Sequence, residues 1–226
     1  SPGFENLRLN QKEWKGCTAF ASRLRFAFGG LHRVADYNLT PALNAFAKNL
    51  QKTDENSEKG TRNILFSSYR NNLNGFNFNR NYLFNSVLRV SVVAVINREN
   101  VSASISLPRI NTEIDVLNVQ RLPYFRLVAS LGAVSDMLYD ASTNTYNPAN
   151  EQMHGINATY TGEWLPAENI LPEQTIEVSM NENFRKVLTE DVTLVVSIAV
   201  EFGKVGFTGV PQEVKYAGSG KVLVCG

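Results

Sequence analysis

The hydrophobic pattern of this 226-residue chain changes its period near Gly60, and that change most constrains the fold. Before Gly60, apolar residues recur at spacings of three and four, as they do along one face of a helix. After it, β-branched runs alternate with polar residues, which is typical of strands joined by turns. We therefore predict an α+β fold in which an N-terminal helical hairpin, residues 1–60, packs against a mainly antiparallel β-sandwich, residues 61–226.

Residues 1–60 contain two helical patterns. The first is an amphipathic helix that runs to about residue 28, where Gly29 and Gly30 favour a stop. Its apolar stripe consists of Phe4, Leu7, Gln11, Trp14, Thr18, Ala21, Arg25 and Phe28, widened by Cys17, Phe20 and Leu24. The pair Thr40-Pro41 predicts the start of a second helix, whose stripe consists of Leu39, Leu43, Phe46 and Leu50. The charged stretch 51–60 is expected to be a solvated loop.

The rest of the chain shows strand patterns without helices between them, which favours an antiparallel sandwich over a βαβ fold. Strands are expected at residues 87–96, 101–107, 124–131, 174–180, 192–202 and 221–224, with further candidates at 114–119 and 156–160. The run at 192–202 is long and apolar enough to be a central strand. Residues 97–100 are expected to form the turn of a hairpin between the first two strands.

Charge balance and the scarcity of metal-binding side chains argue against several classes of function. The chain has 22 Lys and Arg and 21 Asp and Glu, and a net charge of +1 argues against broad nucleic-acid binding. With only 2 Cys and 2 His, a zinc site built from these residue types alone is not expected. No apolar run reaches the roughly 18 residues of a membrane span. We expect no cofactor, no metal, no nucleic-acid partner and no membrane span.

The two cysteines leave two interpretations open. Cys17 and Cys225 lie near opposite ends of the chain, and chain ends often meet, so one interpretation is a disulfide. The favoured interpretation is a pair of buried thiols that behave as small hydrophobic side chains. The cysteines therefore do not fix the redox compartment, and an extracellular or cell-surface location is the working expectation.

No group of residues has the spacing of a catalytic motif. His32 and His154 lack an acid or a nucleophile at motif spacing, so neither indicates a hydrolase triad. A glycosidase needs two opposed carboxylates. The acids in or near loops are Asp136, Asp140, Glu163, Glu168 and Glu173, and solvation of the surface is the favoured reason for them. We therefore predict a protein that is not an enzyme, with a hydrolase built on dispersed carboxylates as the least favoured hypothesis.

The first helix carries the main candidates for binding. Its cations Arg8, Lys12 and Lys15 share one face, and they either meet phosphate or an acidic partner or simply shield the helix. The predicted assembly interface is Phe4, Leu7, Arg8 and Trp14, with Trp14 as an aromatic anchor. A separate set of aromatic rings could stack on sugars, namely Tyr139, Tyr146, Tyr160 and Trp164.

Several blocks of the chain resemble an uncharacterised family of Bacteroidota proteins of about this size. Residues 1–14 are similar to a P-x-F-x-x-x-R-x-N-x-x-E-[FW] signature, and the similarity continues through residues 53–62, 75–79, 124–129 and 196–224. The resemblance implies no reaction and no catalytic residue. It also implies that a short β-hairpin-like segment precedes Ser1 in the intact protein, so that a sheet edge is open in this chain.

These observations together predict a structural or assembly protein. Such a protein would be a subunit of a fibre, a surface appendage or a particle, and it would self-associate through sheet edges and the N-terminal helix. Its partner would be a second copy of itself, in a homo-oligomer or a polymer. The alternative is a β-sandwich module that binds a carbohydrate or another protein.

Overall fold

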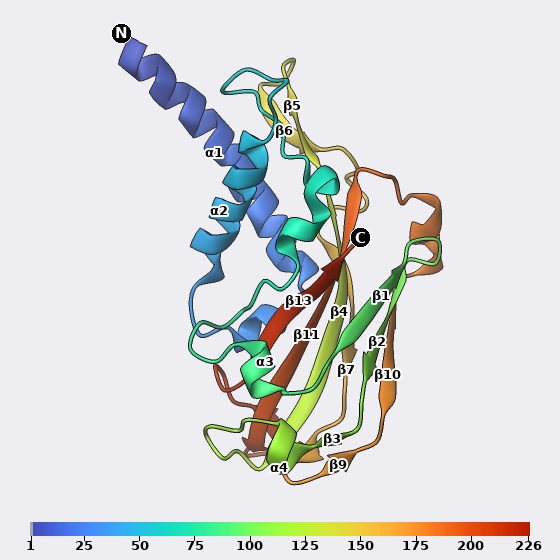
Figure 1. The fold of residues 1–226 in the computed structure, drawn as a ribbon. Helices are drawn as coiled ribbons and strands as arrows, with labels where there is room; N and C mark the ends of the chain where they lie inside the picture. The colour runs from blue at the N-terminus through green and yellow to red at the C-terminus, as the bar shows by residue number, and fades with distance from the viewer. Residues whose placement is uncertain (1) are drawn as a thin grey trace.

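The computed structural model describes residues 2–226 and confirms the α+β fold, with helices packed on antiparallel sheets (Figure 1). The α-helices are α1 (Pro2–Ala27), α2 (Leu39–Lys52), α3 (Phe84–Val87) and α4 (Thr112–Asp115). The 3-10 helices are η1 (Leu31–Val34), η2 (Phe66–Leu73) and η3 (Glu182–Lys186). The predicted helical hairpin is formed by α1 and α2, which pack against each other, with η1 in their connection. No helix in the described part of the chain has the length and apolar character needed to cross a bilayer.

The ends of the hairpin helices follow from local chemistry. Gly29 and Gly30 adopt left-handed backbone angles, with φ of 59° and 87°, and so end α1 where the sequence predicts. The predicted start of α2, with Thr40 as the cap and Pro41 as the first helical residue, is wrong by two residues. The side chain of Asn38 accepts a hydrogen bond from the amide of Thr40 at 3.0 Å and caps the helix, which begins at Leu39.

The strands form two principal sheets and two short ladders, all antiparallel. The main sheet contains β4 (Tyr124–Ser135), β7 (Ile156–Thr161), β8 (Leu165–Pro166), β11 (Val192–Val205), β12 (Pro211–Glu213) and β13 (Ser219–Cys225). Its order is β12-β11-β4-β7, with β13 paired to β11 and β8 paired to β4. The second sheet has the order β1-β2-β10, from β1 (Val93–Asn97), β2 (Ser102–Leu107) and β10 (Gln174–Ser179). The short ladders pair β3 (Ile110–Asn111) with β9 (Ile170–Leu171), and β5 (Met137–Asp140) with β6 (Thr145–Pro148).

The main sheet is buried on both faces and forms the middle of three layers. In β11, Val195 and Ala199 belong to the core that the sheet shares with the helices. Their neighbours Val196 and Ile198 belong to the core that it shares with the second sheet. Because successive side chains point to opposite faces, a strand covered on both sides must be apolar throughout. The prediction of a central strand at 192–202 is confirmed.

Two predicted strands are replaced in part by short helices. Residues 87–96 do not form one strand: α3 ends at Val87, Leu88 forms only an isolated bridge, and β1 begins at Val93. The strand expected at 114–119 is wrong: the side chain of Asn111 accepts from the amide of Glu113 and caps α4, which leaves only a single bridge between Leu88 and Val116.

Gly132 in β4 allows the end of α1 to lie directly against the main sheet. A Cβ atom at this position would lie 2.1 Å from the carbonyl oxygen of Ala27 and 2.6 Å from its Cβ. Since neither atom can rotate away, we expect Gly132→Ala to lower the free energy of unfolding by about 2 kcal/mol. Denaturant titration measures the change, with Gly226→Ala as a control because its Cβ would meet only the flexible side chain of Ile96. An unchanged stability would contradict this packing of α1.

Candidate functional site

Helix α1 is amphipathic, but its buried face is not the stripe expected from the sequence. The buried residues of its middle and end are Glu13, Gly16, Cys17, Phe20, Ala21, Leu24 and Ala27. Of the expected stripe, only Ala21 and Phe28 are buried. The three large residues Phe4, Leu7 and Trp14 are 67%, 50% and 47% exposed. The side chains that were expected only to widen the stripe, Cys17, Phe20 and Leu24, instead form the face that packs on the sheet.

The predicted interface residues therefore lie together on the solvent side of α1. Phe4, Leu7 and Trp14 follow one another at helical spacing, and exposed Arg8 lies next to Leu7. Figure 1 shows the first turns of α1 extending past α2. We call Phe4, Leu7 and Trp14 the exposed stripe.

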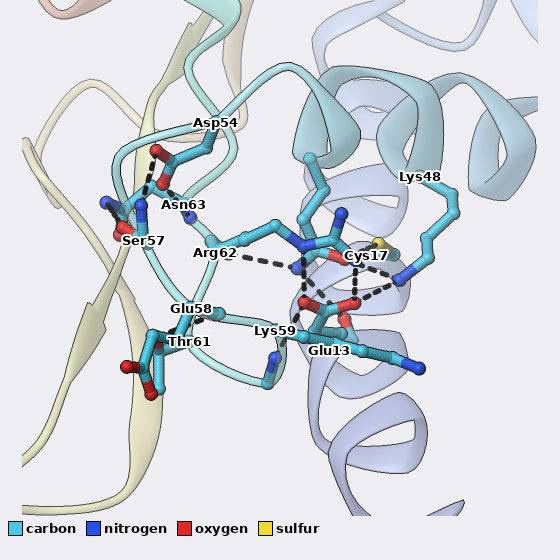
Figure 2. A network of polar contacts seen from close by, with 12 residues as sticks. Glu13, Cys17, Lys48, Asp54, Ser57, Glu58, Lys59, Thr61, Arg62 and Asn63 are labelled. Atoms are coloured by element: carbon cyan, nitrogen blue, oxygen red, sulfur yellow. Dashed lines mark hydrogen bonds and ion pairs between the residues drawn. The ribbon is translucent and has the colours of Figure 1, made fainter. Parts of the chain in front are cut away.

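A buried carboxylate fixes α1 to the rest of the protein (Figure 2). Glu13 is fully buried and accepts hydrogen bonds from Nε and Nη2 of Arg62, both at 2.7 Å. It also accepts from Nζ of Lys48 at 2.5 Å and from the amide of Gly60 at 2.8 Å. The contact with Arg62 is bidentate, which is among the strongest pairings of a carboxylate with a cation. One acid thus joins α1 to α2 and to the loop that follows α2.

The side chain of Gln51 extends this network across four segments. Its Oε1 accepts from the thiol of Cys17 at 3.3 Å and from Nζ of Lys48 at 2.9 Å. Its Nε2 donates to the carbonyl oxygens of Glu13 and Arg62 and to the hydroxyl of Tyr146 in β6. The stretch 51–60 is therefore not the wholly solvated loop that its composition predicts: α2 continues to Lys52, and both Gln51 and Asp54 are buried.

The network keeps its central carboxylate charged. Burial alone would raise the pKa of Glu13, but hydrogen bonds from Arg62, Lys48 and the Gly60 amide lower it to about 2. Burial raises the pKa of the Cys17 thiol to about 11, so this cysteine is protonated at neutral pH. Cys17 and Cys225 are both free and buried, as the favoured interpretation predicts. The polar groups of the network thus act as an anchor for α1.

The cations of α1 line a groove against the β5–β6 hairpin. The hollow has a volume of about 500 Å³ and is lined by Arg8, Gln11, Lys12, Lys15, Gly16, Ala19, Asn144, Thr145 and Tyr146. Nζ of Lys12 lies 4.0 Å from the centre of the Tyr139 ring, which contacts Tyr146 at 5.4 Å between ring centres. Among the described residues, Arg8, Lys12 and Lys15 form no ion pair. The predicted basic face therefore exists and adjoins the exposed stripe.

The four aromatic residues proposed for sugar stacking do not share one surface. Tyr139 and Tyr146 are opposite each other in the β5–β6 ladder and stand beside the basic groove. Trp164 lies against Gly203 and is covered by the guanidinium of Arg126, 4.3 Å from the ring centre. That guanidinium is held in turn by Glu201 at 2.7 Å. Only the tyrosine pair adjoins a hollow that the basic helix also lines.

Among the residues considered for catalysis, His154 and Asp136 have structural partners, whereas the buried Nδ1 of His32 has no hydrogen-bond partner among the described residues. His154 is buried, its Nδ1 accepts from the amide of Ser135, and burial lowers its pKa to about 4. Burial also lowers the pKa of His32, helped by nearby Arg25 and Arg33. Asp136 accepts from the amide and hydroxyl of Ser67. Within the described residues, no group of three or more acids, histidines or cysteines is arranged to hold a metal ion.

The outer edges of β1 and β10 in the second sheet are open in the sense that, within residues 2–226, no further strand pairs with them, although β13 lies near β1 and β7 lies near β10. In β1, Val93 and Val95 are exposed on the outward face of the sheet. An unpaired edge of this kind presents backbone donors and acceptors to another chain.

No family model matches this chain, and no curated protein matches it significantly. The resemblance to Bacteroidota proteins stays a prediction.

Proposed function

We propose that this protein is a non-enzymatic assembly subunit that self-associates through the exposed stripe of α1 and through open sheet edges. It would build a fibre, a surface appendage or a particle. The observation that carries the proposal is the exposure of three large apolar side chains on one face of a helix that is anchored from the opposite face. Single exposed apolar residues are ordinary, whereas three large ones on one helix face, with only Gln11 between Leu7 and Trp14, are the pattern of an interaction surface.

The anchor makes the stripe suitable for association. A helix that is already ordered loses little conformational freedom on binding, so more of the contact energy appears as affinity. Aromatic side chains such as Phe4 and Trp14 are the residues that most often dominate interface energies. A specific contact buries about 1,600 Å² in total, so the stripe would be one part of a surface that also includes neighbouring segments.

The open edges of β1 and β10 supply a second means of association. Strand addition at such an edge gives backbone hydrogen bonds, with side chains on alternate positions setting specificity. Two separate contacts per subunit are what an extended assembly needs, because a single self-complementary contact stops at a dimer.

Substitution of Trp14 tests the proposal. Because this side chain is half exposed, Trp14→Ala is expected to change the free energy of unfolding by less than about 1 kcal/mol. Loss of an aromatic anchor costs at least about 2 kcal/mol of binding energy, so the dissociation constant for self-association should rise about 30-fold. Sedimentation velocity over a range of concentrations measures association, and thermal melting measures stability. A large drop in melting temperature with unchanged association would contradict the proposal.

The tyrosine pair supports one alternative function, a module that binds a carbohydrate or another protein. Tyr139 and Tyr146 stand beside a hollow that three cations also approach. A glycan array probed with the unmodified chain and with Tyr139→Ala separates the two functions. Binding that depends on Tyr139 would favour the alternative, and an absence of hits would favour assembly.

A further inference from the structure

We infer that the contact made by the exposed stripe is head-to-tail: the start of α1 in one copy docks in a hollow at the opposite end of the next copy. The inference rests on the proposed function and names the partner surface of the same site. We call this second surface the α4 hollow. It is lined by Thr112, Glu113, Val116, Asn118, Arg121, Leu122, Pro123, Pro166, Ala167 and Glu168, and its volume is about 650 Å³.

The exposed stripe is poorly suited to pair with the same stripe of a second copy. Its three-and-four spacing places Phe4 and Leu7 at positions a and d of a heptad, which puts Arg8 and Lys15 at the flanking e positions. In an antiparallel pair, these cations would face the same cations of the partner helix. In a parallel pair, Lys15 would face Asn10 and Arg8 would face Gly3, so neither arrangement supplies a carboxylate. Arg8 and Lys15 beside the exposed stripe therefore need acidic side chains on a different surface of the partner copy.

The α4 hollow supplies both the acids and the apolar surface. Glu113 and Glu168 line it and are exposed, against the single cation Arg121. The elements that form or adjoin it also expose Ile114 in α4 and Ile170 in β9, which are 66% and 53% exposed. Apolar side chains next to acids complement a stripe of apolar side chains next to cations, and such charge patterns fix both register and partner.

The two surfaces lie at opposite ends of the molecule. In Figure 1 the start of α1 is at one extremity, while α4, β3 and β9 are at the other. Docking of one surface on the other therefore leaves both a free helix and a free hollow at the ends of each complex. A heterologous contact of this kind continues into a filament unless its rotation closes a ring.

Charge reversal on each surface separates this arrangement from a symmetric one. The helix variant carries Arg8→Glu and Lys15→Glu, and the hollow variant carries Glu113→Lys and Glu168→Lys. All four side chains are exposed, so both variants should melt within a few degrees of the unmodified chain. Each variant alone sets like charges against each other, and its self-association should weaken at least about tenfold.

Mixing the two variants in equal amounts is expected to restore association. In the mixture, the basic helix of the hollow variant meets an acidic hollow, and the acidic helix of the helix variant meets a basic hollow. The chain that carries all four substitutions should also associate alone, for the same reason. Sedimentation velocity of the single variants, the mixture and the fourfold variant gives the comparison.

The outcomes distinguish failure of this inference from failure of the proposed function. If the unmodified chain is a monomer at every concentration, the proposed function falls and the inference falls with it. If the unmodified chain associates and the hollow variant associates equally well, only the head-to-tail contact is overturned. Restored association in both the mixture and the fourfold variant would support the inference.

Discussion

Glu13→Ala is expected to destabilise the protein by about 3–5 kcal/mol, because it leaves two buried or half-buried cations without their counterion. Arg62 and Lys48 both donate to this carboxylate, and the amide of Gly60 loses its acceptor as well. Urea titration measures the change. Glu5→Ala is the matched control, because Glu5 is an exposed acid on the same helix and should change stability by less than about 0.5 kcal/mol.

The same carboxylate predicts a pH dependence. Since the pKa of Glu13 is lowered from an ordinary value of 4.5 to about 2 in the folded protein, its stabilisation is fully present above about pH 5. That stabilisation is lost as the pH falls from about 5 towards 2, while the unfolded chain takes up the proton first. Glu13→Ala should flatten the stability profile over this range. An equally steep profile in the variant would show that other carboxylates cause the acid sensitivity.

Phe20→Ala is expected to cost about 3–5 kcal/mol, the usual effect of truncating a buried phenylalanine. Phe20 is fully buried and makes an edge-to-face contact with Phe66 at 5.7 Å between ring centres. Phe26→Ala is the control on the same helix, because Phe26 is largely exposed and should change stability by less than about 1 kcal/mol. Thermal and urea unfolding of the two variants together identify the buried face of α1. Equal destabilisation by both would contradict the assignment.

The existence of α1 could be predicted from its sequence, but its orientation could not. The three-and-four spacing holds for Cys17, Phe20 and Leu24 as well as for the exposed stripe, in which Gln11 fills the position between Leu7 and Trp14. A charged residue at position 13 counts against a buried face in any pattern argument. Glu13 is nevertheless buried, because it pairs with Lys48 and Arg62, which lie 35 and 49 positions away in the chain. Spacing along one helix carries no information about such partners.

For the strands too, some features can be predicted from the sequence and others cannot. The long apolar run of β11 predicts a central strand because only a strand covered on both faces needs that composition. The β5–β6 hairpin was not predicted, although Asp140 and Asn144 are turn-forming residues at its loop. Its short strands are largely polar on one face and lack the β-branched run that identifies the other strands. Tyr139 and Tyr146 were identified singly, but their pairing depends on this hairpin.

The anchored helix is the reason why we propose an interaction surface as the candidate site. The polar groups of the Glu13 network are paired with other parts of the chain, whereas the exposed stripe faces solvent and, among the described residues, Arg8, Lys12 and Lys15 have no carboxylate partner. An ordered helix with one satisfied face and one unsatisfied face is a typical half of a protein interface.

Sedimentation velocity of the unmodified chain, from low to high micromolar concentration, tests the central claim most directly. If the protein self-associates through rigid surfaces, its weight-average sedimentation coefficient should rise steadily with concentration and should fall back to the monomer value on dilution. A single 25.2 kDa species across the whole range would contradict the account.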